Sequence, residues 1–244
     1  YKRIYTRSES RAYRRIVGLA KRVIPTLLID RGNLVKGKQF EGWRVVGNPI
    51  QAASVHNIRQ VDEMVVFDIT ARKENRPPDY DTIAKIARVN FVPLTVGGNI
   101  CNKETAITLV KECGADKIAL GSNALSIPGL TKEISEAIGC QSVVAVLSRN
   151  REFKRLSYIG EVIIQTVERD GMFKGYDLES IKSAVKELNV PVVASSGCGT
   201  YEDMNLALDA GADAVAAGAL WQFTQSTPKE AKEYLEEKGW EVRL

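Results

Sequence analysis

The stretch Val92-Pro-Leu-Thr-Val-Gly-Gly98 has a similar counterpart later in this chain, and this repetition decides the fold. Its counterpart, Val190-Pro-Val-Val-Ala-Ser-Ser-Gly197, begins about 97 residues later. In both copies a helical pattern leads on to a second shared motif, which is Gly114-Ala-Asp-Lys117 first and Gly211-Ala-Asp-Ala214 second. A β-branched run followed by a helical pattern is typical of a parallel βα unit. A set of such units that occurs twice predicts a molecule built of two similar halves.

Short β-branched runs alternate with helical patterns along the rest of the chain. Eight such runs predict a closed (βα)8 TIM barrel of the α/β class, made of two (βα)4 half-barrels. Thr227-Pro-Lys-Glu230 has the sequence of a capping box with proline at the first helical position, which supports the last helix. The predicted strands are 23–29, 64–69, 92–96, 117–121, 143–148, 162–167, 191–195 and 214–218, and the predicted helices are 49–59, 79–88, 103–112, 129–138, 177–187, 201–209 and 228–238.

Two regions depart from this alternation. Between the fifth and sixth strands only residues 149–160 are available, which leaves little room for a full helix five. Residues 1–20 precede the first strand and are rich in arginine. The predicted organisation is therefore a basic N-terminal extension over 1–20 and a single barrel over 21–244.

Composition narrows the classes of function. Of the 244 residues, 44% are hydrophobic, which suits one packed barrel. The single histidine, His56, lies within a helical pattern, which argues against histidine triads and histidine-rich zinc sites. The four cysteines show no CxxC spacing, and neither a metal nor a cofactor is expected. No apolar run is long enough to span a bilayer, and no secretory signal is recognised, so a cytoplasmic protein without membrane attachment is expected.

The net charge of +4 is unevenly distributed. Eight basic residues and one acid lie within 1–22, and the rest of the chain is close to neutral. This pattern is typical of a solvated arm or of an edge that meets an acidic partner, and it disfavours a nucleic-acid surface.

Glycine-rich turns follow strands of both halves, at the end where barrel enzymes carry their sites. Glycine lets backbone N–H groups approach a phosphate, and the helix that follows adds a favourable dipole. One set in each half predicts two phosphate sites, suited to a bis-phosphate, although the same glycines also fit tight turns. The candidate phosphate-binding residues are Gly97, Gly98, Gly121 and Ser122 in the first half, and Asp170, Gly171, Gly197, Ala217 and Gly218 in the second.

Three ionisable residues stand where a barrel site could use them. Lys36 lies in the long loop after the first strand, as a surface lysine or as a cation that faces a phosphate. Asp68 ends the second strand, where a buried carboxylate is costly without a partner. Asp170 follows the sixth strand, as a turn residue or a site residue. Since histidine is nearly absent, a carboxylate or a lysine is the expected acid or base.

Several motifs together resemble the HisF family, the cyclase subunits of imidazole glycerol phosphate synthase. The resemblance covers about 22–244, apart from 149–160. It implies a barrel that receives ammonia from a glutaminase partner, HisH, docked on the N-terminal face, and that uses it in a lyase and cyclase reaction on a ribulosyl bis-phosphate. The motifs are Arg22-Val-Ile-Pro25, Leu34-Val-Lys-Gly37, Asp62-Glu63 with Asp68-Ile-Thr70, Thr95-Val-Gly-Gly98, Gly114-Ala-Asp-Lys117, Arg169-Asp-Gly171 with Gly175-Tyr-Asp177, and Lys232-Glu-Tyr-Leu235.

The resemblance fails at two catalytic positions. A catalytic aspartate of the family ends strand one, where this chain has Leu28. A second ends strand five, where the matching motif Val144-Ala-Val-Leu147 puts Leu147. Leucine has no transferable proton, so neither position can supply an acid or a base. Asp68 and Lys36 then remain as candidates for catalytic or ligand-positioning roles.

The opposite end of the barrel keeps a feature of the family. HisF has a ring of two basic and two acidic residues at its ammonia entrance, and this chain has Arg22, Glu63, Lys117 and Glu161 at those positions. The resemblance makes these four residues an ammonia gate. Charged rings also cap barrel bottoms simply as satisfied salt bridges, so both interpretations stay open.

With its gate residues retained and the family's catalytic acids replaced, this chain is similar to the second-copy HisF-like proteins of bacterial acetamidino-sugar, O-antigen and lipopolysaccharide pathways. The leading hypothesis is a barrel that channels ammonia from a HisH-like glutaminase, alongside a sugar amidotransferase, to a phosphorylated or nucleotide-linked sugar. The alternatives are a genuine cyclase subunit of histidine biosynthesis and a non-enzymatic scaffold that activates a glutaminase.

Overall fold

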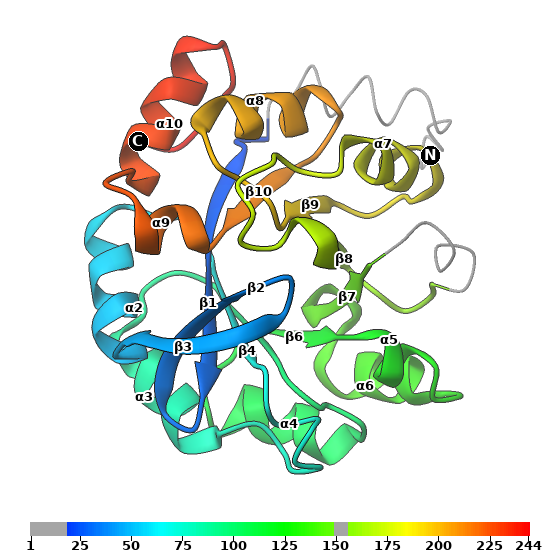
Figure 1. Cartoon of the computed structure of the whole chain (residues 1–244). Coiled ribbons are helices and arrows are strands. Elements are labelled where there is room, and N and C mark those ends of the chain that lie inside the picture. Colours follow the sequence, from blue (N-terminus) through cyan, green and yellow to red (C-terminus); the bar gives the residue numbers. More distant parts are fainter. Residues whose placement is uncertain (1–18, 149–155) are drawn as a thin grey trace.

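The computed structural model describes residues 19–148 and 156–244, which form a closed barrel of eight parallel strands with helices outside it (Figure 1). The sheet order runs β1-β4-β5-β6-β7-β8-β9-β10, and β10 pairs again with β1 to close the barrel. The closing pair sets Arg22 beside Ala214 and Pro25 beside Ala217. The (βα)8 barrel predicted from the repeat is confirmed.

The barrel strands are β1 (Arg22–Asp30), β4 (Met64–Asp68), β5 (Leu94–Gly97), β6 (Lys117–Leu120), β7 (Val143–Leu147), β8 (Glu161–Gln165), β9 (Val192–Ser195) and β10 (Ala214–Ala217). The helices are α2 (Pro49–Ile58), α3 (Tyr80–Val89), α4 (Lys103–Lys111), α5 (Ser122–Leu125), α6 (Leu130–Ile138), α7 (Leu178–Glu187), α8 (Tyr201–Asp209), α9 (Ala219–Phe223) and α10 (Pro228–Glu237), with 3-10 turns η1 (Cys140–Ser142) and η3 (Val167–Arg169). Within these described ranges, no helix has the length and apolar character needed to cross a membrane.

The segment after β1 corrects one expectation. The long loop predicted to carry Lys36 is an antiparallel hairpin of β2 (Asn33–Lys38) and β3 (Glu41–Gly47), which pairs with the end of β1. In Figure 1 this blue hairpin crosses the face of the barrel. Lys36 is therefore a strand residue whose side chain is buried, rather than a loop lysine.

Part of the irregular region lies outside the described residues. The prediction that helix five is missing falls on 149–160, of which 149–155 are not described, while 156–160 contain no helix. The predicted basic extension, 1–20, falls almost entirely on residues that are not described. Both stay predictions.

Most helices begin at a side chain that accepts backbone N–H groups, which satisfies donors left free in a first helical turn. Asp79 starts α3 by accepting from Thr82, and Asp177 starts α7 by accepting from Ser180. The capping box predicted at Thr227 is present, with both of its reciprocal hydrogen bonds. The paired aspartate caps occupy matching places in the two halves and agree with the internal repeat.

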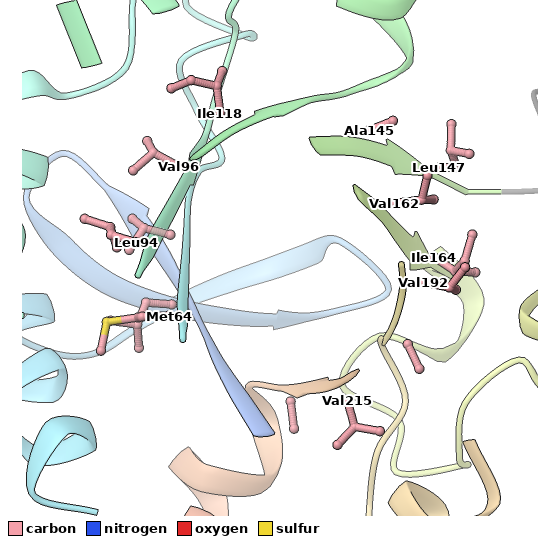
Figure 2. Close-up of a cluster of buried hydrophobic side chains, with 14 of the residues drawn as sticks. Met64, Leu94, Val96, Ile118, Ala145, Leu147, Val162, Ile164, Val192 and Val215 are labelled. Atoms are coloured by element: carbon pink, nitrogen blue, oxygen red, sulfur yellow. The ribbon is translucent and has the colours of Figure 1, made fainter. Parts of the chain in front are cut away.

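The barrel strands separate two hydrophobic cores, because successive side chains of a strand point to opposite faces. The outer core packs between strands and helices and includes Met64, Val96 and Leu147 (Figure 2). The inner core fills the barrel itself. It consists of Ile24, Val65, Ala119, Val144, Ile163, Val193, Ala214 and Ala216, with Phe67 and Val146 packed against it.

Three aspartates fasten neighbouring strands at their N-terminal ends. Asp62 accepts the N–H of Val23 at 2.8 Å and donates its own N–H to the same residue's carbonyl. Asp116 does the same with Leu94, as Asp213 does with Val192. We call these contacts the aspartate clasps. In the fourth equivalent place Gly160 keeps the backbone bond to Val143 without a carboxylate.

Candidate functional site

The floor of the barrel carries a closed ring of four charged residues. Arg22 lies 2.7 Å from a carboxylate oxygen of Glu63 and 2.6 Å from one of Glu161. Lys117 contacts the second oxygens of the same two carboxylates at 3.0 and 2.9 Å. Each charge therefore has two partners of opposite sign. The sequence-predicted gate residues do meet, and we call them the floor ring.

Strand position explains why the ring forms. Lys117 follows the clasp residue Asp116 directly, Glu63 follows Asp62, and side chains one residue further along a strand point to the other face. The clasps thus fix the strand starts while the next side chains point inward. Burial opposes the charged form of Arg22, but attraction by Glu161 and Glu63 outweighs it and raises its pKa above the usual value.

At the other end, the mouth, residues mostly from the second half line a pocket. Five of the residues predicted to bind phosphate belong to this lining, together with Lys36 from the hairpin and Leu28 from β1. We call this the mouth pocket. Its full lining is Thr26, Leu28, Lys36, Gln165, Asp170, Gly171, Ser195, Ser196, Gly197, Cys198, Ala216, Ala217, Gly218 and Ala219.

A buried ion pair crosses the mouth pocket. Lys36 lies 3.1 and 3.3 Å from the two oxygens of Asp170, and the hydroxyl of Ser196 lies 3.4 Å from one of them. The hairpin that brings Lys36 is held by Gln39, whose backbone N–H donates to the carbonyl of Asp170 at 2.9 Å. The pair offers a ligand both a cation and an acceptor without a net charge.

Glycine is required at two positions of the mouth pocket, one against the hairpin and one against a loop of the second half. A Cβ at Gly171 would lie 2.7 Å from the carbonyl oxygen of Gly37, and one at Gly197 would lie 2.3 Å from that of Gly175. Both glycines also have positive φ angles, +69° and +97°. These glycines are therefore needed for backbone packing at the pocket, whatever ligand the pocket takes.

The first-half residues predicted to bind phosphate are placed differently. Gly97 faces the barrel interior, where a Cβ would lie 2.6 Å from the ring of Phe67. Gly98 has a φ of +140° and abuts Asp68. Gly121 and Ser122 are exposed at the start of the single-turn helix α5. None of the four lines the mouth pocket.

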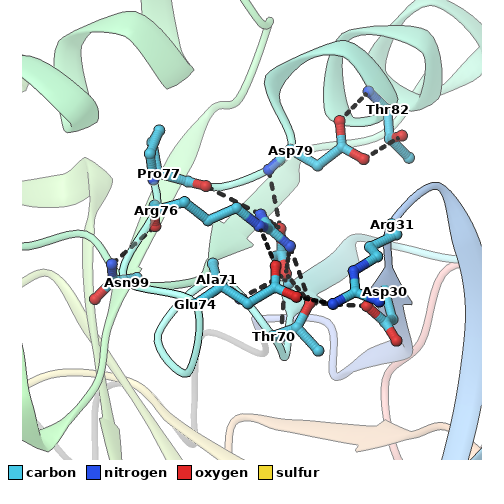
Figure 3. Close-up of polar contacts among 11 residues, drawn as sticks. Asp30, Arg31, Thr70, Ala71, Glu74, Arg76, Pro77, Asp79, Thr82 and Asn99 are labelled. Atoms are coloured by element: carbon cyan, nitrogen blue, oxygen red, sulfur yellow. Dashed lines mark hydrogen bonds and ion pairs between the residues drawn. The ribbon is translucent and has the colours of Figure 1, made fainter.

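Asp68 is held within its own loop rather than directed at a ligand. Figure 3 shows the polar contacts of this loop, with Thr70, Arg76 and Asp79 labelled. Its carboxylate accepts backbone N–H groups from Thr70, Ala71 and Asp79 at 2.9–3.2 Å. The guanidinium of Arg76 adds bonds of 2.7 and 3.2 Å to the two oxygens. This hydrogen bond to Asp68 is the main cause that raises the pKa of Arg76. The structure does not bring Asp68 together with Lys36.

The two leucines at the family's catalytic positions also differ in placement. Leu28 lines the mouth pocket, as expected for a residue that faces the interior. Leu147 instead packs in the outer core beside Ala145, Val162 and Ile164 (Figure 2). This corrects the expectation that Leu147 faces the mouth. Since Val144 and Val146 belong to the inner side, strand alternation gives the next inward place to Ser148, which is exposed.

Sequence reasoning missed several polar residues of the mouth pocket. Thr26, Gln165 and Ser195 all line it, and Gln165 pairs with Ser195 in the strand register. Counting alternate residues from Glu161 of the floor ring would have found Gln165. Cys198 also lines the pocket, but burial raises the pKa of its thiol to about 12. That thiol stays protonated at neutral pH and is a poor nucleophile.

Comparisons with known proteins agree with this architecture. The sequence model of the histidine biosynthesis protein family matches residues 22–226. Imidazole glycerol phosphate synthase subunit HisF of Exiguobacterium sibiricum is 34% identical over 92% of this chain and 100% of its own length. The HisF subunit of Clostridium botulinum is 34% identical over 93% and 100%, and that of Dictyoglomus thermophilum is 35% identical over 93% and 99%. This chain therefore belongs to the HisF family of histidine biosynthesis proteins.

Proposed function

We propose that this barrel takes ammonia from a HisH-type glutaminase at the floor ring and delivers it at the mouth for amidination of a surface-polysaccharide sugar. The sugar is phosphorylated or nucleotide-linked, and a separate sugar amidotransferase completes the reaction in the cytoplasm. The observation that carries the proposal is Leu28 in the mouth pocket, where the family's resemblance places a catalytic aspartate.

The interior between floor and mouth supports passage of a neutral molecule. Above the floor ring the inner core is aliphatic, with Ile24, Val65 and Val144 among its members. Such an environment strongly disfavours a charged group, so ammonia would cross it unprotonated. Unprotonated ammonia is the nucleophile that amidination requires.

The mouth pocket supports delivery rather than ring closure. General acid–base catalysis needs a group that can exchange a proton with the reacting atoms. Leu28 has none, the Cys198 thiol is protonated, and Lys36 is paired with Asp170. We propose that Lys36, Asp170, Gly171, Gly197, Ala217 and Gly218 hold the phosphate or sugar end of the ligand. In the first half, Gly98, Gly121 and Ser122 remain the candidates for a second phosphate.

The decisive experiment is a ring-closure assay with the purified chain, free ammonia and the ribulosyl bis-phosphate substrate. We expect no turnover, and robust turnover would contradict the proposal. The positive counterpart adds the glutaminase, glutamine, the sugar amidotransferase, its sugar substrate and a nucleoside triphosphate, which activates the amide oxygen so that it departs on a phosphoryl or nucleotidyl group as nitrogen takes its place. Mass spectrometry detects the exchange of oxygen for nitrogen. Leu28→Asp is the matched variant, because it restores the carboxylate at the mouth without touching the floor ring.

A second candidate function is that of a genuine cyclase subunit in histidine biosynthesis. The Lys36–Asp170 pair supports it if a substrate separates the two side chains, because a cation and a carboxylate are then both free at the mouth pocket. The near full-length similarity to curated HisF subunits favours it as well. Growth of a HisF-deficient bacterial strain on medium without histidine, after expression of this chain, would decide for the cyclase.

A further inference from the structure

The mouth pocket contains a side-chain amide that is open to a ligand. Gln165 points to the same side of β8 as Glu161 of the floor ring and Ile163 of the inner core, because alternate side chains of a strand share a face. Gln165 is half-buried and lines the pocket. Among residues 19–148 and 156–244, no partner is hydrogen-bonded to its amide. Its N–H donors and its acceptor oxygen are therefore available to a ligand.

Two hydroxyl groups accompany this amide. Ser195 is paired with Gln165 in the register of β8 with β9. Thr26 on β1 and Gln165 on β8 are each the second inward-facing residue after the floor ring on their strand. Both hydroxyls belong to side chains that line the mouth pocket, and in the part of the chain that the structure describes neither is hydrogen-bonded or sealed from solvent. Three neutral hydrogen-bonding groups thus face the pocket.

The pocket also has an apolar wall. Leu28, Ala216 and Ala217 line it, and Ala216 is a member of the inner core as well. Among the described residues of the lining, the two charged ones are Lys36 and Asp170, which are paired with each other. Apolar surroundings disfavour a charged group that has no partner. The pocket therefore suits a neutral group that combines hydrogen-bonding atoms with a small apolar end.

We infer that Gln165 is a specificity-determining residue, which selects ligands that carry an acylamino group such as acetamido. Its Nε2 donates to the acyl oxygen, the hydroxyl of Ser195 or Thr26 accepts the N–H of the ligand, and the acyl methyl packs against the apolar wall. A sugar hydroxyl at this place would leave the apolar wall unfilled. An ionised group would lose its solvation there without gaining a free partner of opposite charge.

The inference rests on the proposed function in one respect, because it takes the phosphate end of the ligand to lie at Lys36. Lys36 and Gln165 both line the mouth pocket, so one ligand can reach both side chains. On β8 the next inward-facing residue towards the floor is Ile163 of the inner core. An acyl group held by Gln165 is then the part of the ligand nearest to the barrel interior. The ligand class is an acylamino sugar phosphate, bound with its acyl group inward.

The test measures dissociation constants of the full-length chain for N-acetylglucosamine 1-phosphate and glucose 1-phosphate by titration calorimetry. The two sugars differ only in that an acetamido group replaces one hydroxyl. The wild-type chain should bind the acetamido sugar roughly tenfold more tightly, as expected for one or two added hydrogen bonds. Gln165→Met, which has a similar shape without the amide, should bind both sugars alike, with the wild-type affinity for glucose 1-phosphate. That retained affinity also establishes that the variant is folded.

Gln51→Met is the matched control, because Gln51 is exposed on α2, outside the pocket. It should keep the full preference for the acetamido sugar. Equal affinities of the wild-type chain for the two sugars, or an undiminished preference in Gln165→Met, would overturn the role of Gln165. Either result would leave ammonia delivery, which the ring-closure assay tests, unaffected. If the wild-type chain bound neither sugar phosphate, the inference would fall together with the proposed phosphate site at Lys36.

Discussion

The two halves of this barrel have similar sequences, but their loops at the mouth hold their aspartates in different ways. In the second half, Asp170 reaches Lys36 and Ser196 across a pocket. In the first half, the carboxylate of Asp68 is occupied by Arg76 and by backbone amides of its own loop. A repeated motif thus predicts a repeated backbone, but not a repeated site. The side chains that approach each motif decide whether it is open to a ligand.

The largest expected difference concerns the two aspartates. Asp68→Asn should lower the free energy of unfolding by about 3 kcal/mol or more, because three backbone N–H groups and the guanidinium of Arg76 lose a fully buried carboxylate. The carboxylate of Asp170 accepts hydrogen bonds from fewer donors, so Asp170→Asn should lower the free energy of unfolding by less, roughly 1–3 kcal/mol. Urea denaturation followed by fluorescence measures both. Equal losses would remove the distinction between a structural and a ligand-facing aspartate.

The next largest expected effect is a difference in stability between the two halves at acid pH. Burial, with a smaller contribution from Arg59, lowers the pKa of His56 in α2 to about 4, below its ordinary value of 6.5. The unfolded chain therefore binds a proton more readily than the folded one, and stability falls as pH drops from about 6.5 to 4. The full effect is about 3 kcal/mol. Amide protection factors, which correct for the intrinsic pH dependence of exchange, should fall more in α2 than in α7 when the pH is lowered from 7 to 5. His56→Leu should remove this difference between the two helices.

A smaller effect tests why Gly97 is a glycine. Gly97→Ala would force a methyl group against the ring of Phe67, at an expected cost of about 1–3 kcal/mol. The added change Phe67→Leu should recover part of this loss by making room. Gly121→Ala is the control, because nothing lies within 4 Å of a Cβ there. If Gly97→Ala were as harmless as Gly121→Ala, Gly97 would be free to serve a ligand.

The smallest effect concerns ligand affinity. Calorimetric titration with glycerol phosphate should detect one dominant site per chain. Lys36→Met should weaken that site about tenfold, since it removes one charge-assisted contact. Ser122→Ala should leave the measured affinity unchanged. Two sites of equal affinity would mean that the halves bind phosphate alike after all.

The sequence predicted the barrel well because periodicity and helix caps are local signals. Every predicted strand and helix is present with its ends shifted by only a few residues, as at β5 and α10. The hairpin 33–47 was missed because its pairing partner is the end of β1, and the single-turn helices α5 and α9 are too short to show a period. A local sequence pattern reveals neither a distant pairing partner nor a single helical turn.

The site was predicted less completely, because contacts across the barrel decide it. The family resemblance led to the four residues of the floor ring and to Leu28 at the mouth. For the second catalytic position it led to Leu147, which faces the outer core, because a shift of one residue along a strand moves a side chain to the other face. The partnership of Asp68 with Arg76 could not be read from spacing, since the residues between them, 69–75, had to fold into a loop first.

The absence of an aspartate clasp at Gly160 leaves the pairing of β7 with β8 without a side-chain hydrogen bond of this kind. Each of the three aspartates adds a side-chain hydrogen bond to the backbone bond at its strand junction, and the junction of β7 with β8 lacks that addition. Replacement by aspartate is blocked, because a Cβ there would lie 2.6 Å from the Cα of Gln141. Among the four alternate junctions of this kind, the one between β7 and β8 is therefore the least secured, and it lies opposite the strands that the hairpin reinforces.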